Sequence, residues 1–407
     1  MDVLSPPSHT TEVSPPPPTS YRSPLLKREM PGLDALRGVA VLSVVAYHGL
    51  HWWLVPAVAI SPAAQWLSAI AAPGWLGVNL FFILSGFLIT GILLDTRTRP
   101  NYWKNFYVRR ILRILPLYLV TLLILRFTPV LGISWTYVLV CLLYLANFAP
   151  AMHLESYGPL WSLAVEEQFY LVWPFLVRRL RPRTLAIICL ASIFVSPILR
   201  YLSVSGILPL GDIAAATWLL TDNIAFGALF AILLRSRAAT IARIRTATLV
   251  CALLGGAFLF AGLDRHLLSR SAPFAAAFQP EPFLLLFSAL LLLSLQYGDH
   301  PAVFRLTGPL RFYGYISYGL YLLHLLGFRL YQALFVDLFH PIPELTLPRL
   351  LLRFFAVLIP ATIVCYLSRR YFEEYALRLK DRLVPYTSPR KPVPPQPLIS
   401  TPPSSVN

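Results

Sequence analysis

Residues 74–94 indicate the fold class: they read GWLGVNLFFILSGFLITGILL and contain no charged side chain. An α-helix of this length reaches about 30 Å at 1.5 Å per residue, the thickness of the hydrocarbon core of a bilayer. The 407-residue chain is 57% hydrophobic and 13% charged, whereas soluble proteins have about 45–50% apolar and about 25% charged residues. We therefore predict an all-α, polytopic membrane protein. This excludes a disulfide-rich secreted module, a DNA-binding domain and an ordinary cytosolic enzyme.

Ten further apolar runs follow the same pattern. They lie near residues 36–56, 107–128, 135–150, 160–177, 184–204, 212–234, 247–263, 282–297, 311–336 and 349–368. Eleven crossings would place the two ends of the chain on opposite sides of the membrane. The shortest run in the region of conflict, 135–150, reaches only about 24 Å as a helix. We therefore predict about ten transmembrane helices plus one short re-entrant or half-span element.

The charge distribution gives the orientation. The chain has 34 Lys and Arg against 18 Asp and Glu, a net charge of +16. The positive residues gather in short loops between apolar runs, which the positive-inside rule places in the cytoplasm. They precede the first run and follow the last, at Arg369 and Arg370. We predict an inner-membrane protein with both termini cytoplasmic, and no nucleic-acid partner, because nucleic-acid binding needs an exposed basic face.

Four segments are expected along the chain. Residues 1–31 and 385–407 are proline-rich and polar, so we expect disordered tails. Residues 32–370 form the membrane domain, and residues 371–384 have the pattern of an amphipathic helix on the inner surface. The four cysteines lie in apolar runs without a CxxC pair, so no metal site is predicted.

Ionisable residues within the membrane are costly and are functional candidates by default. Arg37 and His48 are eleven positions apart, about three helical turns, and so share a helix face. Asp34 can pair with Arg37. The alternatives are a cytoplasmic anchor for Arg37 and an interhelical hydrogen bond for His48.

Further polar residues lie within the later apolar runs or near their ends. Arg110 and Arg113, spaced i and i+3, suit a phosphate clamp or a cytoplasmic anchor. Glu166 and the adjacent Glu167 point about 100° apart, so at least one must meet a cation, a proton or a substrate. Ser85, followed by Gly86, is typical of close helix packing. We interpret His324, taken alone, as a structural residue.

Five motifs stand in order at compatible spacing: Leu33-Asp34-Ala35-Leu36-Arg37-Gly38 with His48, Phe82 to Ile89, Arg110-x-x-Arg113-Ile114-Leu115-Pro116, Trp161 to Tyr170, and Ser317-Tyr318-x-x-Tyr321-x-x-His324. Together they resemble the acyltransferase-3 family of integral membrane O-acyltransferases, over roughly residues 32–370. The resemblance implies a ten-span fold, no bound cofactor, a cytoplasmic acyl-CoA (commonly acetyl-CoA) as co-substrate, and a sugar or lipid-linked glycan as hydroxyl acceptor. Two positions depart from the family pattern. Asn79 stands where aspartate is common, and Leu220 stands where an arginine is expected before Asp222, so the role of Asp222 stays open.

The resemblance assigns functional roles to particular residues. We predict His48, Arg37 and Glu166 as catalytic residues, with His48 the base or a transient acyl carrier and Glu166 its orienting or proton-coupling partner. We predict that Arg110, Arg113 and Ser85 bind the acyl-CoA at the inner mouth of a cavity. The alternative is a proton-coupled transporter that uses the intramembrane His, Glu and Asp residues as a relay.

Overall fold

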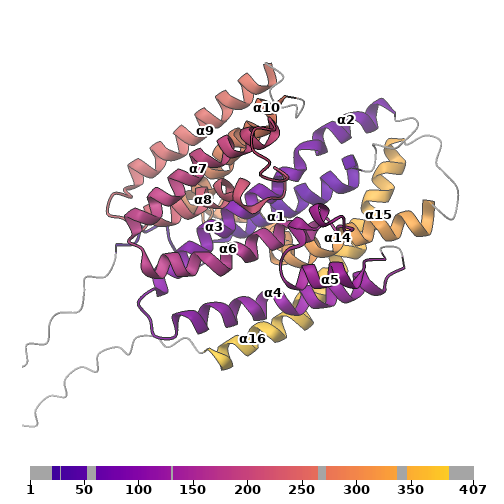
Figure 1. Cartoon of the computed structure of the whole chain (residues 1–407), viewed down its shortest axis with the longest axis horizontal. Helices are drawn as coiled ribbons and strands as arrows, with labels where there is room; N and C mark the ends of the chain where they lie inside the picture. The colour runs from indigo at the N-terminus through magenta and orange to yellow at the C-terminus, as the bar shows by residue number, and fades with distance from the viewer. Residues whose placement is uncertain are drawn as a thin grey trace, which may run out of the picture.

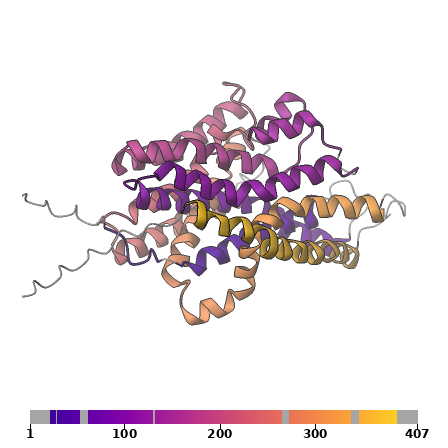
Figure 2. The same ribbon diagram turned by 90° about the horizontal axis from the view of Figure 1, so that it is seen from below.

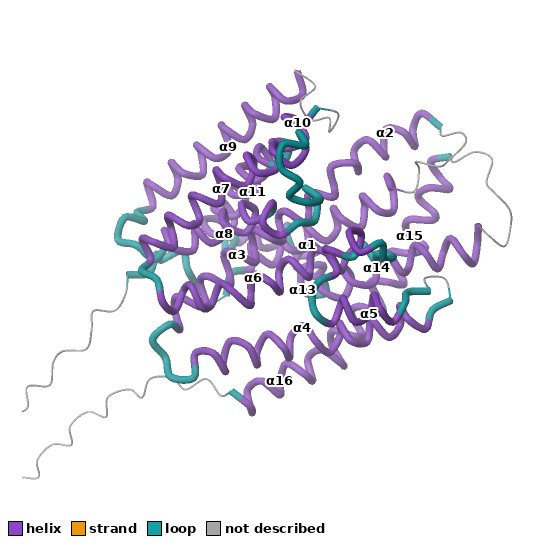
Figure 3. Tube along the Cα trace, in the orientation of Figure 1, coloured by secondary structure: helices purple, strands orange, loops and turns teal. Residues whose placement is uncertain are grey.

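The computed structural model describes residues 21–27, 29–52, 61–129, 132–264, 272–336 and 346–384. Within these ranges every regular element is a helix (Figures 1 and 3). Six helical segments are long and apolar enough to cross a membrane: Pro31–His51, Pro62–Thr96, Pro182–Val204, Ile241–Gly262, Pro273–Tyr297 and Leu347–Leu379. The predicted all-α polytopic class is confirmed, while the number of ten spans stays a prediction. Of the predicted tails, residues 1–20, 28 and 385–407 lie outside the described residues.

Two long helical segments in the first quarter of the chain pack together. α1 (Pro31–Ala46) continues into a π-helical turn at Tyr47–His51. α2 (Pro62–Ala71), a 3₁₀ turn and α3 (Gly77–Thr96) form a second continuous segment. Proline in the first turn starts both segments, because its fixed φ suits a helix and its missing N–H costs nothing there.

The middle of the chain contains α4 (Tyr102–Phe127), α5 (Trp135–Leu142), α6 (Pro159–Arg179) and α7 (Pro182–Val204). α5 has 8 residues, about 12 Å at 1.5 Å per residue. This length is too short to cross a bilayer and agrees with the half-span element predicted for this run. Two 3₁₀ turns at Ala146–Phe148 and Pro150–Met152 lead from α5 toward α6.

The predicted run 212–234 is a shorter helix than expected. α8 covers only Thr221–Leu233. Gly211 adopts a left-handed φ of 99°, and the Asp212 carboxylate accepts a hydrogen bond from the Ala214 N–H at 2.8 Å. These two features turn the chain before the helix can begin. The apolar composition of 213–220 therefore belongs to a buried connection.

The last part of the chain contains α9 (Ile241–Asp264), α10 (Pro273–Phe278), α11 (Glu281–Tyr297), α12 (Pro301–Leu306), α13 (Gly308–Tyr315), α14 (Ser317–Tyr331), α15 (Leu347–Leu367) and α16 (Glu374–Leu383). A break at Ile316 divides the predicted run 311–336 into α13 and α14. α16 packs along α4 (Figures 1 and 2). The Arg109 guanidinium donates to the Val384 carbonyl oxygen at 2.7 Å.

Close approach of α3 and α8 fixes the position of Ser85. A Cβ on Gly86 would lie 2.0 Å from the Ile224 carbonyl oxygen, and one on Gly227 would lie 1.9 Å from the Ile83 oxygen. Only glycine permits the two backbones to approach this closely. With its glycine neighbour against α8, Ser85 turns toward the space between α3 and α6. This confirms the close helix packing predicted at Ser85 and Gly86.

Candidate active site

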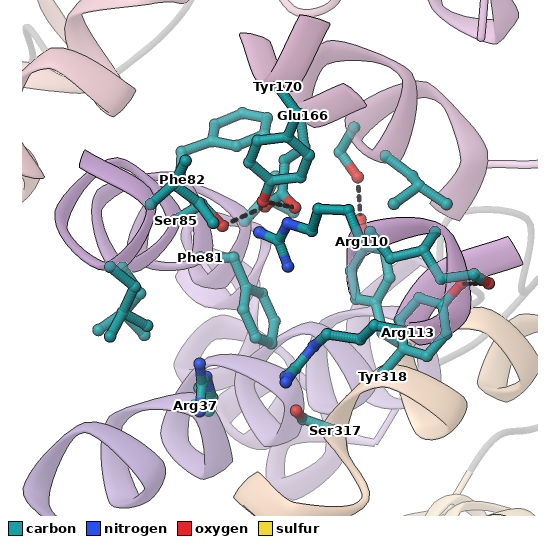
Figure 4. Close-up of a pocket in the computed structure, with 18 of the residues that line it drawn as sticks. Arg37, Phe81, Phe82, Ser85, Arg110, Arg113, Glu166, Tyr170, Ser317 and Tyr318 are labelled. Carbon is teal, nitrogen blue, oxygen red and sulfur yellow. Dashed lines mark hydrogen bonds between the residues drawn. The ribbon is translucent and has the colours of Figure 1, made fainter. Parts of the chain in front are cut away.

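Helices α1, α3, α4, α6 and α14 enclose a cavity of about 200 Å³. α1 contributes Arg37, α3 contributes Ser85, α4 contributes Arg110 and Arg113, and α6 contributes Glu166. Figure 4 shows these side chains converging from separate helices. The structure thus brings together every predicted site residue except His48. We call this space the arginine cavity.

The arginine cavity carries an excess of positive charge. Its lining includes three guanidinium groups and one carboxylate, Glu166. The charges of Arg37 and Arg110 both act unfavourably on Arg113. The Arg113 side chain is exposed where it borders the cavity. Converging guanidinium groups form a suitable site for an anion such as a phosphate.

Two of these arginines also have protein partners. As predicted, the Arg37 guanidinium pairs with the Asp34 carboxylate, one turn earlier on α1, at 2.7 Å. The Arg110 guanidinium lies over the Tyr170 ring, 4.0 Å from its centroid. Such stacking holds a guanidinium plane in place while its N–H groups stay available.

Glu166 is held from two sides. The Ser85 hydroxyl donates to its Oε1 at 2.9 Å, and the Tyr170 hydroxyl donates to its Oε2 at 2.9 Å. Glu167 lines neither this cavity nor the one described next. Of the two adjacent carboxylates, Glu166 therefore faces the cavity. Tyr170 contacts both Glu166 and Arg110, and so links the carboxylate to the arginines.

A second cavity, of about 510 Å³, lies toward the opposite ends of α1, α3, α6 and α14. α1 lines the arginine cavity with Arg37 but the second cavity with Val44 and His48, which are further along the helix. α3 and α6 run the other way and line the second cavity with their first residues. The two cavities are therefore stacked along the helix axes. We call the second one the histidine cavity.

The histidine cavity is rich in aromatic rings and polar groups. Its lining includes Trp52, Trp75 and Trp161, together with the amides of Asn79 and Asn147. Flat aromatic faces next to hydrogen-bonding groups are suited to a ligand with both apolar faces and polar edges. Sugar rings have this character.

A thin partition separates the two cavities. Val78, Phe82 and Tyr321 line both of them. The Tyr321 hydroxyl forms a hydrogen bond with the Ser162 hydroxyl, which joins α14 to α6 at this level. We call these three shared residues the septum. The two cavities therefore adjoin each other at the septum.

His48 contacts a residue that the sequence reasoning treated as structural. The Nδ1 atom of His48 lies 3.1 Å from the Nε2 atom of His324 on α14. Among the described residues, the predicted contact between His48 and Glu166 does not form, since the two line different cavities. One sequence signal could have predicted that His324 takes part in the site: the spacing Tyr321-x-x-His324 places two polar side chains one helical turn apart on the same face.

The two positions that depart from the family pattern border one buried polar cluster. Arg200 of α7, only 1% exposed, pairs with Asp222 at 2.7 Å and with Glu281 of α11. Arg200 thus supplies, from another helix, the guanidinium that the resemblance placed at position 220. The Asn79 amide donates to Asn223 beside it. Asp222 is fully buried within this cluster and ties α7 and α8 together.

Comparison with known families identifies the chain. A profile of the family described as "Acyltransferase domain" matches residues 30–370, which confirms the resemblance found in the motifs. No solved structure matches the chain significantly.

Three curated relatives show the same similarity over part of the chain. The O-acetyltransferase OatA of Staphylococcus aureus (strain NCTC 8325 / PS 47) is 35% identical over 205 residues, covering 43% of this chain and 30% of the relative. The putative peptidoglycan O-acetyltransferase YrhL of Bacillus subtilis (strain 168) is 38% identical over 174 residues, covering 37% and 24%. The peptidoglycan O-acetyltransferase OatA of Listeria monocytogenes serovar 1/2a (strain ATCC BAA-679 / EGD-e) is 32% identical over 166 residues, covering 36% and 24%. The match spans less than a third of the length of these relatives.

Proposed function

Since this chain belongs to the acyltransferase-3 family, we propose that it is a membrane O-acetyltransferase. It transfers an acetyl group from acetyl-CoA to a hydroxyl group of a cell-envelope glycan. The donor binds at the arginine cavity, and the acceptor enters the histidine cavity. The stacking of the two cavities across a thin septum is the observation that carries this proposal.

The arginine cavity suits the donor. Coenzyme A carries phosphate groups, and three convergent guanidiniums provide donors in the fork geometry that phosphates bind best. The C-terminal ends of α3, α6 and α8 lie on the same side as the arginine cavity. Arg97, Arg178, Arg179 and Arg235 lie at or just after these ends. Such basic flanks favour the cytoplasmic side of the membrane, where acyl-CoA is made.

The histidine cavity suits the acceptor. Its aromatic lining and its amides match a sugar, and two of the three relatives are named peptidoglycan O-acetyltransferases. A peptidoglycan sugar is therefore the acceptor that we propose.

The transfer needs one base and one anion site. The base His48 takes the proton of the acceptor hydroxyl as the oxygen attacks the thioester carbonyl. The new C–O bond forms, the C–S bond breaks, and the proton passes from His48 to the leaving thiolate of coenzyme A. The arginines hold the donor so that its thioester reaches the septum, which supplies proximity.

The test uses purified protein in lipid nanodiscs with radiolabelled acetyl-CoA and a soluble peptidoglycan fragment. We expect release of free coenzyme A and label on the fragment without any ion gradient, which a proton-coupled transporter would not produce. His48→Gln should abolish transfer. His51→Gln is the matched control, because His51 bonds to the Ser68 hydroxyl and lines neither cavity. Full transfer by His48→Gln would refute the base assignment.

A further inference from the structure

Two histidines from distant parts of the chain meet beside the septum. The rings of His48, at the end of α1, and His324, on α14, have centroids 5.0 Å apart. Both line the histidine cavity, but His324 has no accessible surface, whereas His48 is partly exposed. We infer that His324 is a positioning residue: it fixes His48 as the tautomer with hydrogen on Nδ1 and leaves the Nε2 lone pair free for the acceptor. The catalytic use of that lone pair rests on the proposed function, whereas the tautomer does not.

The surroundings of His324 determine which of its nitrogens carries hydrogen. Its Nδ1 atom lies 2.8 Å from the Tyr321 carbonyl oxygen and 3.1 Å from that of Leu320. Carbonyl oxygens only accept hydrogen bonds, so this nitrogen must carry a hydrogen. A fully buried ring avoids a positive charge without a nearby carboxylate. His324 is therefore neutral, and its Nε2 is an acceptor.

The same reasoning then applies to His48. Its Nδ1 atom lies 3.1 Å from the His324 Nε2 and 2.9 Å from the Val44 carbonyl oxygen. Both partners are acceptors, so the His48 Nδ1 must carry the hydrogen. The opposite tautomer would point a nitrogen lone pair at the Val44 oxygen. Among the described residues, the His48 Nε2 has no hydrogen-bond partner, so its lone pair is available in the histidine cavity.

α14 is braced at the level of His324. The hydroxyl of Tyr157, which precedes α6, donates to the Leu322 carbonyl oxygen at 2.8 Å and accepts from the Leu326 N–H at 2.9 Å. The Tyr157 hydroxyl thus takes the place of a direct hydrogen bond from the Leu326 N–H to the Leu322 carbonyl oxygen, and so anchors this turn of α14. Tyr321, one turn before His324, is also tied to Ser162. These contacts hold His324 in place, as a positioning residue requires.

Three substitutions at His324 separate the accepting group from the shape of the side chain. His324→Gln can place an amide oxygen where the ring has Nε2, and so can still accept from His48. His324→Asn is one carbon shorter; it can keep a donor near the Tyr321 carbonyl but cannot reach His48. His324→Phe fills the space of the ring with no acceptor. Thermal unfolding in detergent shows whether each variant is folded.

The direct measurement is solid-state ¹⁵N NMR of the histidine ring nitrogens, on full-length ¹⁵N-histidine-labelled protein in lipid. A difference spectrum against His48→Gln identifies the His48 signals. We expect the Nδ1–H form in the unsubstituted protein and in His324→Gln. We expect a smaller share of this form in His324→Asn and His324→Phe, where the Val44 carbonyl oxygen is the one acceptor that remains for the His48 Nδ1–H. His51→Gln should leave the His48 signals unchanged. An unchanged His48 tautomer in folded His324→Phe would overturn the inference.

Turnover gives the second measurement. We expect kcat to fall at least tenfold in His324→Asn and His324→Phe, with KM for acetyl-CoA unchanged and most of kcat retained in His324→Gln. Equal loss in the Gln and Asn variants would contradict the positioning role. The NMR result needs no activity, so a protein that shows the expected tautomer but never transfers acetyl groups would refute only the proposed function.

Discussion

Arg113→Gln tests the arginine cavity most sharply, because it should change donor binding and protein stability in opposite directions. The cavity lining holds three guanidinium groups and one carboxylate, so its surplus is two positive charges and falls to one in the variant. Arg113 is exposed to the cavity, and the like charges of Arg37 and Arg110 act unfavourably on it. Removing it relieves that repulsion, so the substrate-free variant should unfold at a higher temperature. Binding sites often retain such costly groups for function.

The loss in donor binding follows from the contact removed. A hydrogen bond to a charged group contributes about 1.5–3 kcal/mol, and about 1.4 kcal/mol corresponds to tenfold in affinity. Arg113→Gln should therefore raise the KM for acetyl-CoA roughly 10- to 140-fold, with a smaller effect on kcat. Free coenzyme A should lose its inhibitory affinity by a similar factor.

The assay is coenzyme A release in nanodiscs together with thermal unfolding in detergent. Arg126→Gln is the matched control: Arg126 is on the same helix but lines neither cavity, and it stacks on Trp135 at 4.9 Å. The control should keep the KM for acetyl-CoA. If Arg113→Gln also kept that KM, or unfolded at a lower temperature than the unsubstituted protein, the assignment of an anion site would be wrong.

Three further outcomes follow from the packing and hydrogen bonds. Gly86→Ala should destabilise the fold by about 1–3 kcal/mol through overpacking against α8. The control Gly256→Ala, whose Cβ would meet open space, should stabilise the fold by up to about 1 kcal/mol. Equal unfolding temperatures of the two variants would argue against the tight contact between α3 and α8. Ser85→Ala removes one of two hydroxyl donors to Glu166. Turnover should fall by a factor of about 10 to 140, since a hydrogen bond to a charged group contributes about 1.5–3 kcal/mol; unchanged coenzyme A release would show that Ser85 has no part in the reaction. Arg200→Met leaves the buried Asp222 and the partly buried Glu281 without their cation and should cost about 3–5 kcal/mol. Neutralising both carboxylates in the same variant should restore much of the unfolding temperature, and an unstable triple variant would contradict this account.

The sequence predicted the features that a single helix determines. Apolar runs predicted most helices, because a membrane span must be long and apolar. Charged residues within these runs indicated functional candidates, because a charge within the membrane needs a partner or a function. The family resemblance then placed Arg110 and Arg113 together at the mouth of one cavity.

Contacts between distant helices were harder to predict. His324 meets His48, and Arg200 meets Asp222, only because α14 approaches α1 and α7 approaches α8 at particular rotations and depths. A sequence gives the face of each helix but not the rotation of one helix against the next. The late start of α8 was missed for a local reason: the turn at Asp212 lies within a run that apolar composition alone marks as helical.

The septum also bears on how such proteins diversify. The arginine cavity and the histidine cavity lie on either side of it, and among the described residues only Val78, Phe82 and Tyr321 line both. Substitutions around the histidine cavity can therefore accumulate without disturbing the arginine cavity. Under the proposed function, selection can change the accepted glycan while the use of acetyl-CoA is inherited intact. Only at the three septum residues would a substitution alter the acceptor site and the donor site together.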